Sequence, residues 1–291
     1  LFMLLILIAA FFAGKYQLEA YKGEYYFRQS LLASRSNDGS KTLGFVQKAI
    51  GANPKIDTYH RTLAQFSLNA AVNLTQKGSL SDNEKQLLGQ LAQVGVDQAK
   101  VASGYQILPL RLPGISSANV ENWETLSRVY QALIGAVNGA DVHAANSLAQ
   151  AIALDPQNPI LHDQLGQLYQ RVGNLDSASR KYEDSVVVKS NYGPGHYRLA
   201  KVLIEKKADV PRIVNELSLA KTYLDPKDPV IEDINKDLET YNKQLQDLQK
   251  EALQKQAQQA AGASPTPSAS PSPSQTASPS PSAKASPSPT F

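Results

Sequence analysis

Four histidines have side chains that could do chemistry in this sequence: His60, His143, His162 and His196. None of them stands three to five residues from another histidine, and none is near a carboxylate cluster at the spacing of a metal site. The sequence has no G-x-S-x-G, P-loop or G-x-G-x-x-G motif, and it has no cysteine. We therefore expect no catalytic residue, no metal site and no cofactor.

His162 and His196 are 34 residues apart, which suggests that they occupy the same place in two successive repeats. The stretch 159–192 predicts two short helices separated by a break at Gly173-Asn174. Apolar residues at helical spacing form a face on each helix: Leu161, Leu165, Leu168 and Tyr169, then Leu175, Ala178 and Tyr182. Two such helices cannot bury these faces alone, so they need neighbours of the same kind.

The stretches on either side follow the same plan. Leu165 and Leu199 are 34 residues apart, and so are Tyr169 and Leu203. The upstream stretch has Trp123, Leu126, Tyr130, Ala144, Leu148, Ala151 and Asp155-Pro156. The downstream stretch has His196, Leu199, Ala200, Leu203, Leu217, Ala220 and Asp225-Pro226. The Asp-Pro pairs predict helix ends, because a residue before proline is pushed out of the helical region.

This pattern resembles the tetratricopeptide repeat (TPR), a 34-residue unit that reads W-x2-L-G-x2-Y…A-x3-F…P. The 159–192 unit has Ser190 where proline is usual, and the 120–158 unit has Ser127 for the glycine and extra residues between Ala136 and Val142. The 159–192 unit matches the pattern at Leu165, Gly166, Tyr169, Gly173, Asn174, Ala178 and Tyr182. The resemblance implies an all-α, TPR-type α-solenoid in which His162 and His196 pack between helices.

The resemblance also implies a binding surface, because the first helix of each pair lines the concave side of such a stack. The side chains that it places there are Glu121, Glu124, Arg128, Gln131, Asp163, Gln167, Gln170, Tyr197 and Lys201. They lack the Lys/Asn set that clamps a terminal carboxylate in chaperone-binding members of the family. We expect a protein or extended peptide segment as the ligand. The alternative is a groove that is only solvated.

Composition limits the other function classes. The chain has 291 residues, a net charge of +3 and 19% charged residues, which is too mild a balance to indicate nucleic-acid binding. Apolar residues make up 42% of the sequence, enough for a core in the middle of the chain. They are unevenly spread: the first 14 residues are almost wholly apolar, and the last 28 are almost wholly Ser, Pro, Ala and Thr.

Residues 1–18 predict a membrane helix. The uncharged stretch Leu1 to Gly14 would span roughly 21 Å as a helix, whereas a bilayer core measures ~30 Å. We therefore expect that the sequence begins inside a longer membrane helix. A signal peptide and a buried helix are the alternatives. Tyr16 and Tyr21 fit an interfacial belt, whereas Tyr25 fits either this belt or the core of a first repeat.

Residues 19–118 predict divergent repeats, and 119–229 the regular ones. The divergent part divides into 19–55, with a turn at Asn37-Asp38-Gly39, and 57–110. Within the latter, Ser81 followed by Glu84 predicts a capping box at the start of a helix. That helix continues to about Gly104. The residues from Leu108 to Ser117 predict a loop.

Two further segments follow the repeats. Residues 230–262 have apolar residues at alternating steps of three and four, which predicts a helix that caps the last repeat or forms a coiled coil. Its later part, Gln254 to Gln259, is polar and is expected to fray. Residues 263–291 have proline at roughly every second or third position, which predicts a disordered spacer whose hydroxyls could also carry sugars.

These features favour a bacterial, membrane-anchored TPR scaffold that binds and does not catalyse. An alternative is the C-terminal TPR region of a longer polytopic membrane enzyme, similar to an O-antigen ligase or polymerase, with its active site outside this chain. A third hypothesis is a secreted adaptor. The Ser/Pro/Thr-rich tail favours an extracytoplasmic repeat region, and the oligomeric state is left open.

Overall fold

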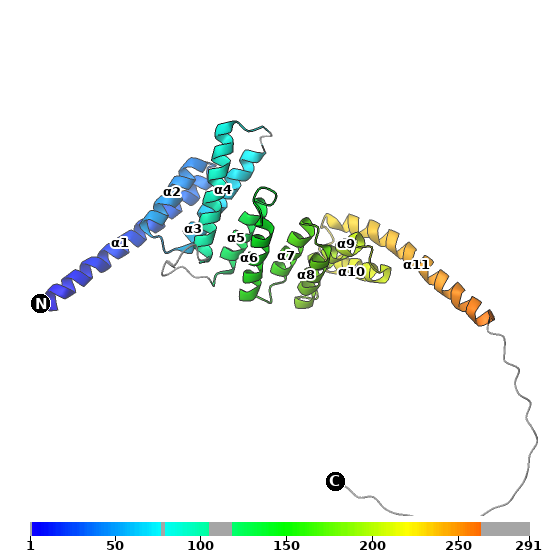
Figure 1. The fold of residues 1–291 in the computed structure, drawn as a ribbon. Helices are drawn as coiled ribbons and strands as arrows, with labels where there is room; N and C mark the ends of the chain where they lie inside the picture. Colours follow the sequence, from blue (N-terminus) through cyan, green and yellow to red (C-terminus); the bar gives the residue numbers. More distant parts are fainter. Residues whose placement is uncertain (1, 77–78, 105–117, 263–291) are drawn as a thin grey trace, which may run out of the picture. The chain divides into compact units, whose positions relative to one another are not determined.

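The computed structural model describes residues 2–76, 79–104 and 118–262. Within these residues the chain forms eleven α-helices and no strand (Figure 1). The helices are α1 (Phe2–Arg35), α2 (Gly39–Ala52), α3 (Asp57–Thr75), α4 (Asp82–Ser103), α5 (Val120–Ala132), α6 (Ala140–Leu154), α7 (Pro159–Arg171), α8 (Leu175–Val188), α9 (Gly193–Glu205), α10 (Val210–Tyr223) and α11 (Val230–Gly262). The predicted loop at 108–117 and the predicted tail at 263–291 lie outside the described residues.

Local capping explains where several helices begin and end. The Asn158 side chain accepts a hydrogen bond from the Ile160 N–H, and Pro159 occupies the first helical position of α7. The predicted capping box is confirmed, because the Ser81 hydroxyl and the Glu84 carboxylate each accept a hydrogen bond from the other's backbone N–H. Gly104 ends α4 in the left-handed region with φ of 66°.

Consecutive helices pack as hairpins, and each hairpin packs on the next. Contacts join α3 to α4, α5 to α6, α7 to α8 and α9 to α10, and further contacts join α4 to α5, α6 to α7 and α8 to α9. The first helices of neighbouring hairpins also contact each other: α3 contacts α5, and α7 contacts α9. The all-α, TPR-type solenoid predicted from the 34-residue spacing is confirmed by these hairpins.

Two clusters of buried side chains hold the hairpins together. The first joins α3 and α4 to the hairpin α5–α6 and to Leu165 and Leu168 of α7. The second joins Ala178 and Tyr182 of α8 to α9, α10 and α11. Tyr169 packs against both clusters, so apolar contact continues from one to the other. Each cluster draws its residues from more than one hairpin, so these hairpins bury their apolar faces against one another, as the sequence predicts.

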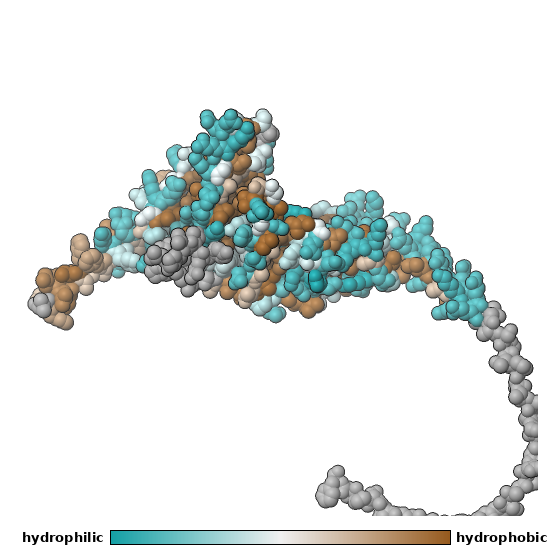
Figure 2. Space-filling view, viewed as in Figure 1, coloured by the Kyte–Doolittle hydropathy of each residue, from teal (hydrophilic) through white to brown (hydrophobic). Residues whose placement is uncertain are grey.

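Helix α1 differs from the expectation that the first segment ends at residue 18. It runs from Phe2 to Arg35 without a break, because neither Gly14 nor Gly23 interrupts it. It is the one helix, among the residues that the structure describes, that is long and apolar enough to cross a membrane, and none of its most apolar window is buried. Figure 2 shows the apolar surface at the free end of this helix.

Helix α11 belongs to two compact units, 1–243 and 244–291, which we describe separately. In the first unit Ile234 is fully buried, and Val230, Ile231, Leu238 and Tyr241 pack against the second cluster. The predicted cap is therefore confirmed for the first half of α11. In the second unit the expected fraying of Gln254 to Gln259 is not seen, since the helix continues to Gly262 with exposed side chains at these positions.

Candidate binding face

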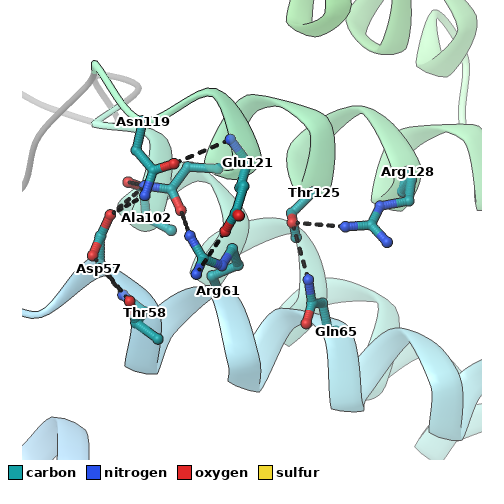
Figure 3. A network of polar contacts seen from close by, with 10 residues as sticks. Asp57, Thr58, Arg61, Gln65, Ala102, Asn119, Glu121, Thr125 and Arg128 are labelled. Atoms are coloured by element: carbon teal, nitrogen blue, oxygen red, sulfur yellow. Dashed lines mark hydrogen bonds and ion pairs between the residues drawn. The ribbon is translucent and has the colours of Figure 1, made fainter. Parts of the chain in front are cut away.

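The first helices of successive hairpins form one side of the unit 1–243. We call this the first-helix face and define it by α3, α5, α7, α9 and the start of α11. Polar side chains of each of these helices bond to the next one. At the α3–α5 step, Asp57 accepts hydrogen bonds from Asn119 (2.9 Å) and Asn122 (2.7 Å), and Gln65 donates to Thr125 (3.2 Å) (Figure 3).

Glu121 and Arg128 lie at this step. Arg61 of α3 pairs with Glu121 (2.9 Å) and donates to Asn122 (3.0 Å). The Arg61 side chain is 15% exposed and that of Glu121 is 68% exposed, so Glu121 is open to solvent. The Arg128 guanidinium is exposed and donates to Thr125 (3.2 Å), as Figure 3 shows.

Burial acts to raise the pKa of Asp57, but its hydrogen bonds from Asn122, Asn119 and Thr58 leave this pKa below the ordinary value.

Glu124 and Gln131 connect α5 to α7. Gln164 donates to the Glu124 carboxylate (3.0 Å). The Gln131 amide nitrogen donates to the Ser127 hydroxyl (3.1 Å), and the Gln131 amide oxygen accepts from the Arg171 guanidinium (3.3 Å). The amide therefore links the end of α7 to α5.

Asp163 differs from the expected groove-lining position, because its side chain is buried, with the residue only 2% exposed. The Arg198 guanidinium of α9 covers it at 2.6 Å, and Gln167 donates to the same carboxylate oxygen at 2.9 Å. Burial raises the pKa of Asp163 even though the Arg198 charge opposes the shift. Asp163 thus holds the Arg198 and Gln167 side chains in place and is itself covered by them.

Gln170, Tyr197 and Lys201 connect α7, α9 and α11. Gln170 donates to Glu205 (3.1 Å) and accepts from the Tyr182 hydroxyl (2.9 Å). Lys201 pairs with Asp237 of α11 (3.0 Å), and the Tyr197 hydroxyl lies 3.5 Å from Asp233. Burial acts to lower the pKa of Lys201, but the hydrogen bond to Asp237 and its charge leave it above the ordinary value.

A cavity of about 410 Å³ opens on this face at α7 and α9. It is lined by Gln167, Gln170, Arg171, Tyr182, Tyr197, Arg198 and Lys201. Four of these seven residues were predicted from the sequence, and Arg171, Tyr182 and Arg198 were missed. Arg171 directly follows Gln170, and Arg198 directly follows Tyr197. A prediction that included the residue after each predicted position would therefore have contained both arginines. The predicted residues on α5 do not line this cavity.

The described residues contain no group of three or more histidine, cysteine, aspartate or glutamate side chains that could hold a metal ion. The predicted packing of His162 and His196 between helices is confirmed, since both are buried. Each donates from Nε2 to a backbone carbonyl six residues earlier, His162 to Pro156 (3.0 Å) and His196 to Ser190 (2.9 Å).

No family model matches this chain, and no curated protein matches it significantly. Solved structures of TPR proteins are similar to it. TTC0263 from Thermus thermophilus is 16% identical, with 75% of this chain and 98% of that chain covered and a TM-score of 0.46. PilF from Pseudomonas aeruginosa is 14% identical, with 84% and 99% covered and a TM-score of 0.47. MamA from Desulfovibrio magneticus is 14% identical, with 71% and 97% covered and a TM-score of 0.48. Matches at this level carry no information on what the chain binds.

Proposed function

We propose that this protein is a membrane-anchored scaffold that binds a protein or extended peptide segment on its first-helix face. The observation that carries the proposal is the cavity of about 410 Å³ between α7 and α9. Four residues that the sequence assigned to a binding surface meet there: Gln167, Gln170, Tyr197 and Lys201. Around it, Glu121, Glu124, Arg128 and Gln131 continue the same face on α5.

The chemistry of this face suits a peptide backbone with polar side chains. Amides such as Gln167 can donate and accept, and Arg171 and Lys201 supply charged donors. The Lys201 and Arg198 side chains are already held by Asp237 and Asp163, so a ligand would not have to order them. Pre-ordered side chains lower the entropic cost of binding.

Site-specific photo-crosslinking tests the face directly. A photoreactive amino acid would replace Gln167 on α7 or, as a control, the exposed Arg180 on α8. We expect crosslinked partner bands from position 167 and none from position 180. Arg128→Glu and Lys201→Glu should each weaken the bands, because both reverse a charge on the face. Equal labelling from both positions, or bands unaffected by either charge reversal, would contradict the proposed face.

The anchor is the apolar part of α1, whose large side chains are exposed; Phe2, for example, is 78% exposed. Such a surface is stable in contact with lipid and unfavourable in water. We expect the full chain to stay with the membrane fraction after alkaline carbonate washing. Release by carbonate would show that α1 does not span the bilayer.

We place the repeats on the extracytoplasmic side, in keeping with the Ser/Pro-rich tail. The absence of native cysteine makes a labelling test simple. A Gln254→Cys variant should react with a membrane-impermeant maleimide on intact cells. Reaction only after the cells are opened would place the repeats in the cytoplasm.

The polytopic-enzyme hypothesis makes a separate prediction. It requires several more hydrophobic spans encoded upstream of Leu1. Reading that upstream sequence would decide between the enzyme and the single-span scaffold.

A further inference from the structure

The turn between α2 and α3 lies against α1 beyond the end of its apolar stretch. Asn53 packs against Gly23, where an added Cβ would lie 3.2 Å from the Asn53 Cβ. Nearer the N-terminus, the Lys55 ammonium lies 5.9 Å from the centre of the Tyr16 ring, within range of a cation–π contact. The α2–α3 turn therefore lies alongside the part of α1 between Tyr16 and Gly23.

A cavity of about 600 Å³ lies between this turn and α1. Its apolar lining includes Phe12 and Pro54, and its charged lining includes Lys15, Lys55 and Glu19. Among the residues that the structure describes, Glu19 pairs with Lys22 (3.4 Å), and neither Lys15 nor Lys55 forms an ion pair. The cavity therefore combines apolar side chains with two lysines that form no ion pair within the described residues, and the Glu19 carboxylate lines it as well.

The spacing along α1 matches the layers of a bilayer. From Phe12 to Glu19 the helix rises about 10 Å, and the headgroup region on one side of a bilayer is roughly 5–8 Å thick. If Phe12 lay at the edge of the hydrocarbon, Lys15 and Tyr16 would lie among the headgroups. Ile56, which follows Lys55 at the end of the turn, is a large apolar residue that is 36% exposed.

We propose that the α2–α3 turn rests on the membrane surface and that Lys15 and Lys55 together bind the phosphate of an anionic phospholipid. The lipid's chains would lie against Phe12, and Ile56 would enter the interface. Lysine near an anionic surface is favoured electrostatically, and tyrosine is favoured at the interface. The inference rests on the proposed membrane anchor.

Nanodiscs test this inference with the full chain. An Ile56→Cys variant carries a single polarity-sensitive nitrobenzoxadiazole label, since the protein has no other cysteine. The fluorescence emission of the label is compared between discs of phosphatidylcholine and discs with about 30% phosphatidylglycerol, which makes the disc surface anionic. We expect a blue shift and a brighter signal in the phosphatidylglycerol discs. Lys15→Glu with Lys55→Glu should abolish this difference, whereas the same charge change at the exposed Lys236 and Lys243 should preserve it.

The outcomes separate the lipid site from the anchor. Failure of the chain to enter neutral discs would overturn the anchor, and the inference with it. Entry into both discs with the same emission would overturn the lipid site alone. The lipid site would also be overturned if the difference in emission between the discs persisted after the double charge reversal at Lys15 and Lys55. The same conclusion would follow if the control reversal at Lys236 and Lys243 also removed that difference.

Discussion

At the scale of single residues, Gly166 shows why the helices of one hairpin can approach so closely. A Cβ at this position would lie 2.6 Å from Cε1 and 2.7 Å from Cδ1 of Tyr182. The Tyr182 ring is fully buried and its hydroxyl is bonded to Gln170, so it has little freedom to move. Gly166 occupies the glycine position of the repeat pattern, and the Tyr182 ring fills the space that a side chain there would need.

Gly166→Ala should therefore destabilise the protein by about 1–3 kcal/mol, the usual cost of overpacking. Gly44→Ala is the matched control, because its Cβ would meet nothing within 4 Å in the interior of α2. It should raise stability by up to about 1 kcal/mol, the difference in helix propensity. Thermal unfolding followed by circular dichroism measures both. Equal melting temperatures for the two variants would refute the packing argument.

His196 makes stability depend on pH. Its Nδ1 lies 2.7 Å from the Glu216 carboxylate, and its Nε2 donates to the Ser190 carbonyl at 2.9 Å. Burial acts to lower the pKa of His196, but the bonds to Glu216 and Ser190 leave it above 6.5. Because the folded pKa is raised, this stabilisation is complete below about pH 6.5 and is lost as the pH rises through the folded value.

The wild type should therefore be more stable than Glu216→Gln by about 1.5–3 kcal/mol at about pH 6, the range for hydrogen bonds to charged groups. The gap should narrow as the pH is raised through the folded pKa of His196, because the imidazole then loses its proton. Urea unfolding over a series of pH values from about 6 upward gives the differences. A gap that stays constant or widens would show that the His196 charge does not stabilise the fold.

At the scale of helices, the sequence predicted what depends on local spacing and missed what depends on packing between elements. The capping box at Ser81 and Glu84 involves neighbours in the chain, so it could be predicted. The continuity of α1 past residue 18 was missed, although no breaker follows, because the later part of the helix packs against α2 and sequence spacing does not show such packing. The regular spacing of Ile231, Ile234 and Leu238 predicted a helix with one apolar face, but it left both a cap and a coiled coil open.

The cap makes a direct prediction. Ile234 is fully buried against the last hairpin, so Ile234→Ala should remove about 2–5 kcal/mol of stability there. Leu253→Ala, in the same helix but 65% exposed, should change stability by less than about 0.5 kcal/mol. Limited trypsin digestion should then cut faster in α9 and α10 of the first variant only. Equal cutting rates in the two variants would contradict the cap.

At the scale of the whole molecule, the arrangement of the first-helix face could be predicted only in outline. The repeat pattern placed Gln167, Gln170, Tyr197 and Lys201 on one side, and the cavity brings them together. The burial of Asp163 was missed because it depends on Arg198 reaching across from α9, in the next hairpin. Contacts of that kind follow from the offset between hairpins, which the sequence of one repeat does not contain.

The hairpins are stable because they share buried surface with their neighbours. Hydrogen exchange on the full chain, compared between the wild type and Leu165→Ala, tests this dependence most directly. Leu165 of α7 packs in one cluster with Leu126 of α5 and Leu148 of α6. We predict faster amide exchange in α5 and α6 as well as in α7. Faster exchange confined to α7, with α5 and α6 as protected as in the wild type, would contradict the claim.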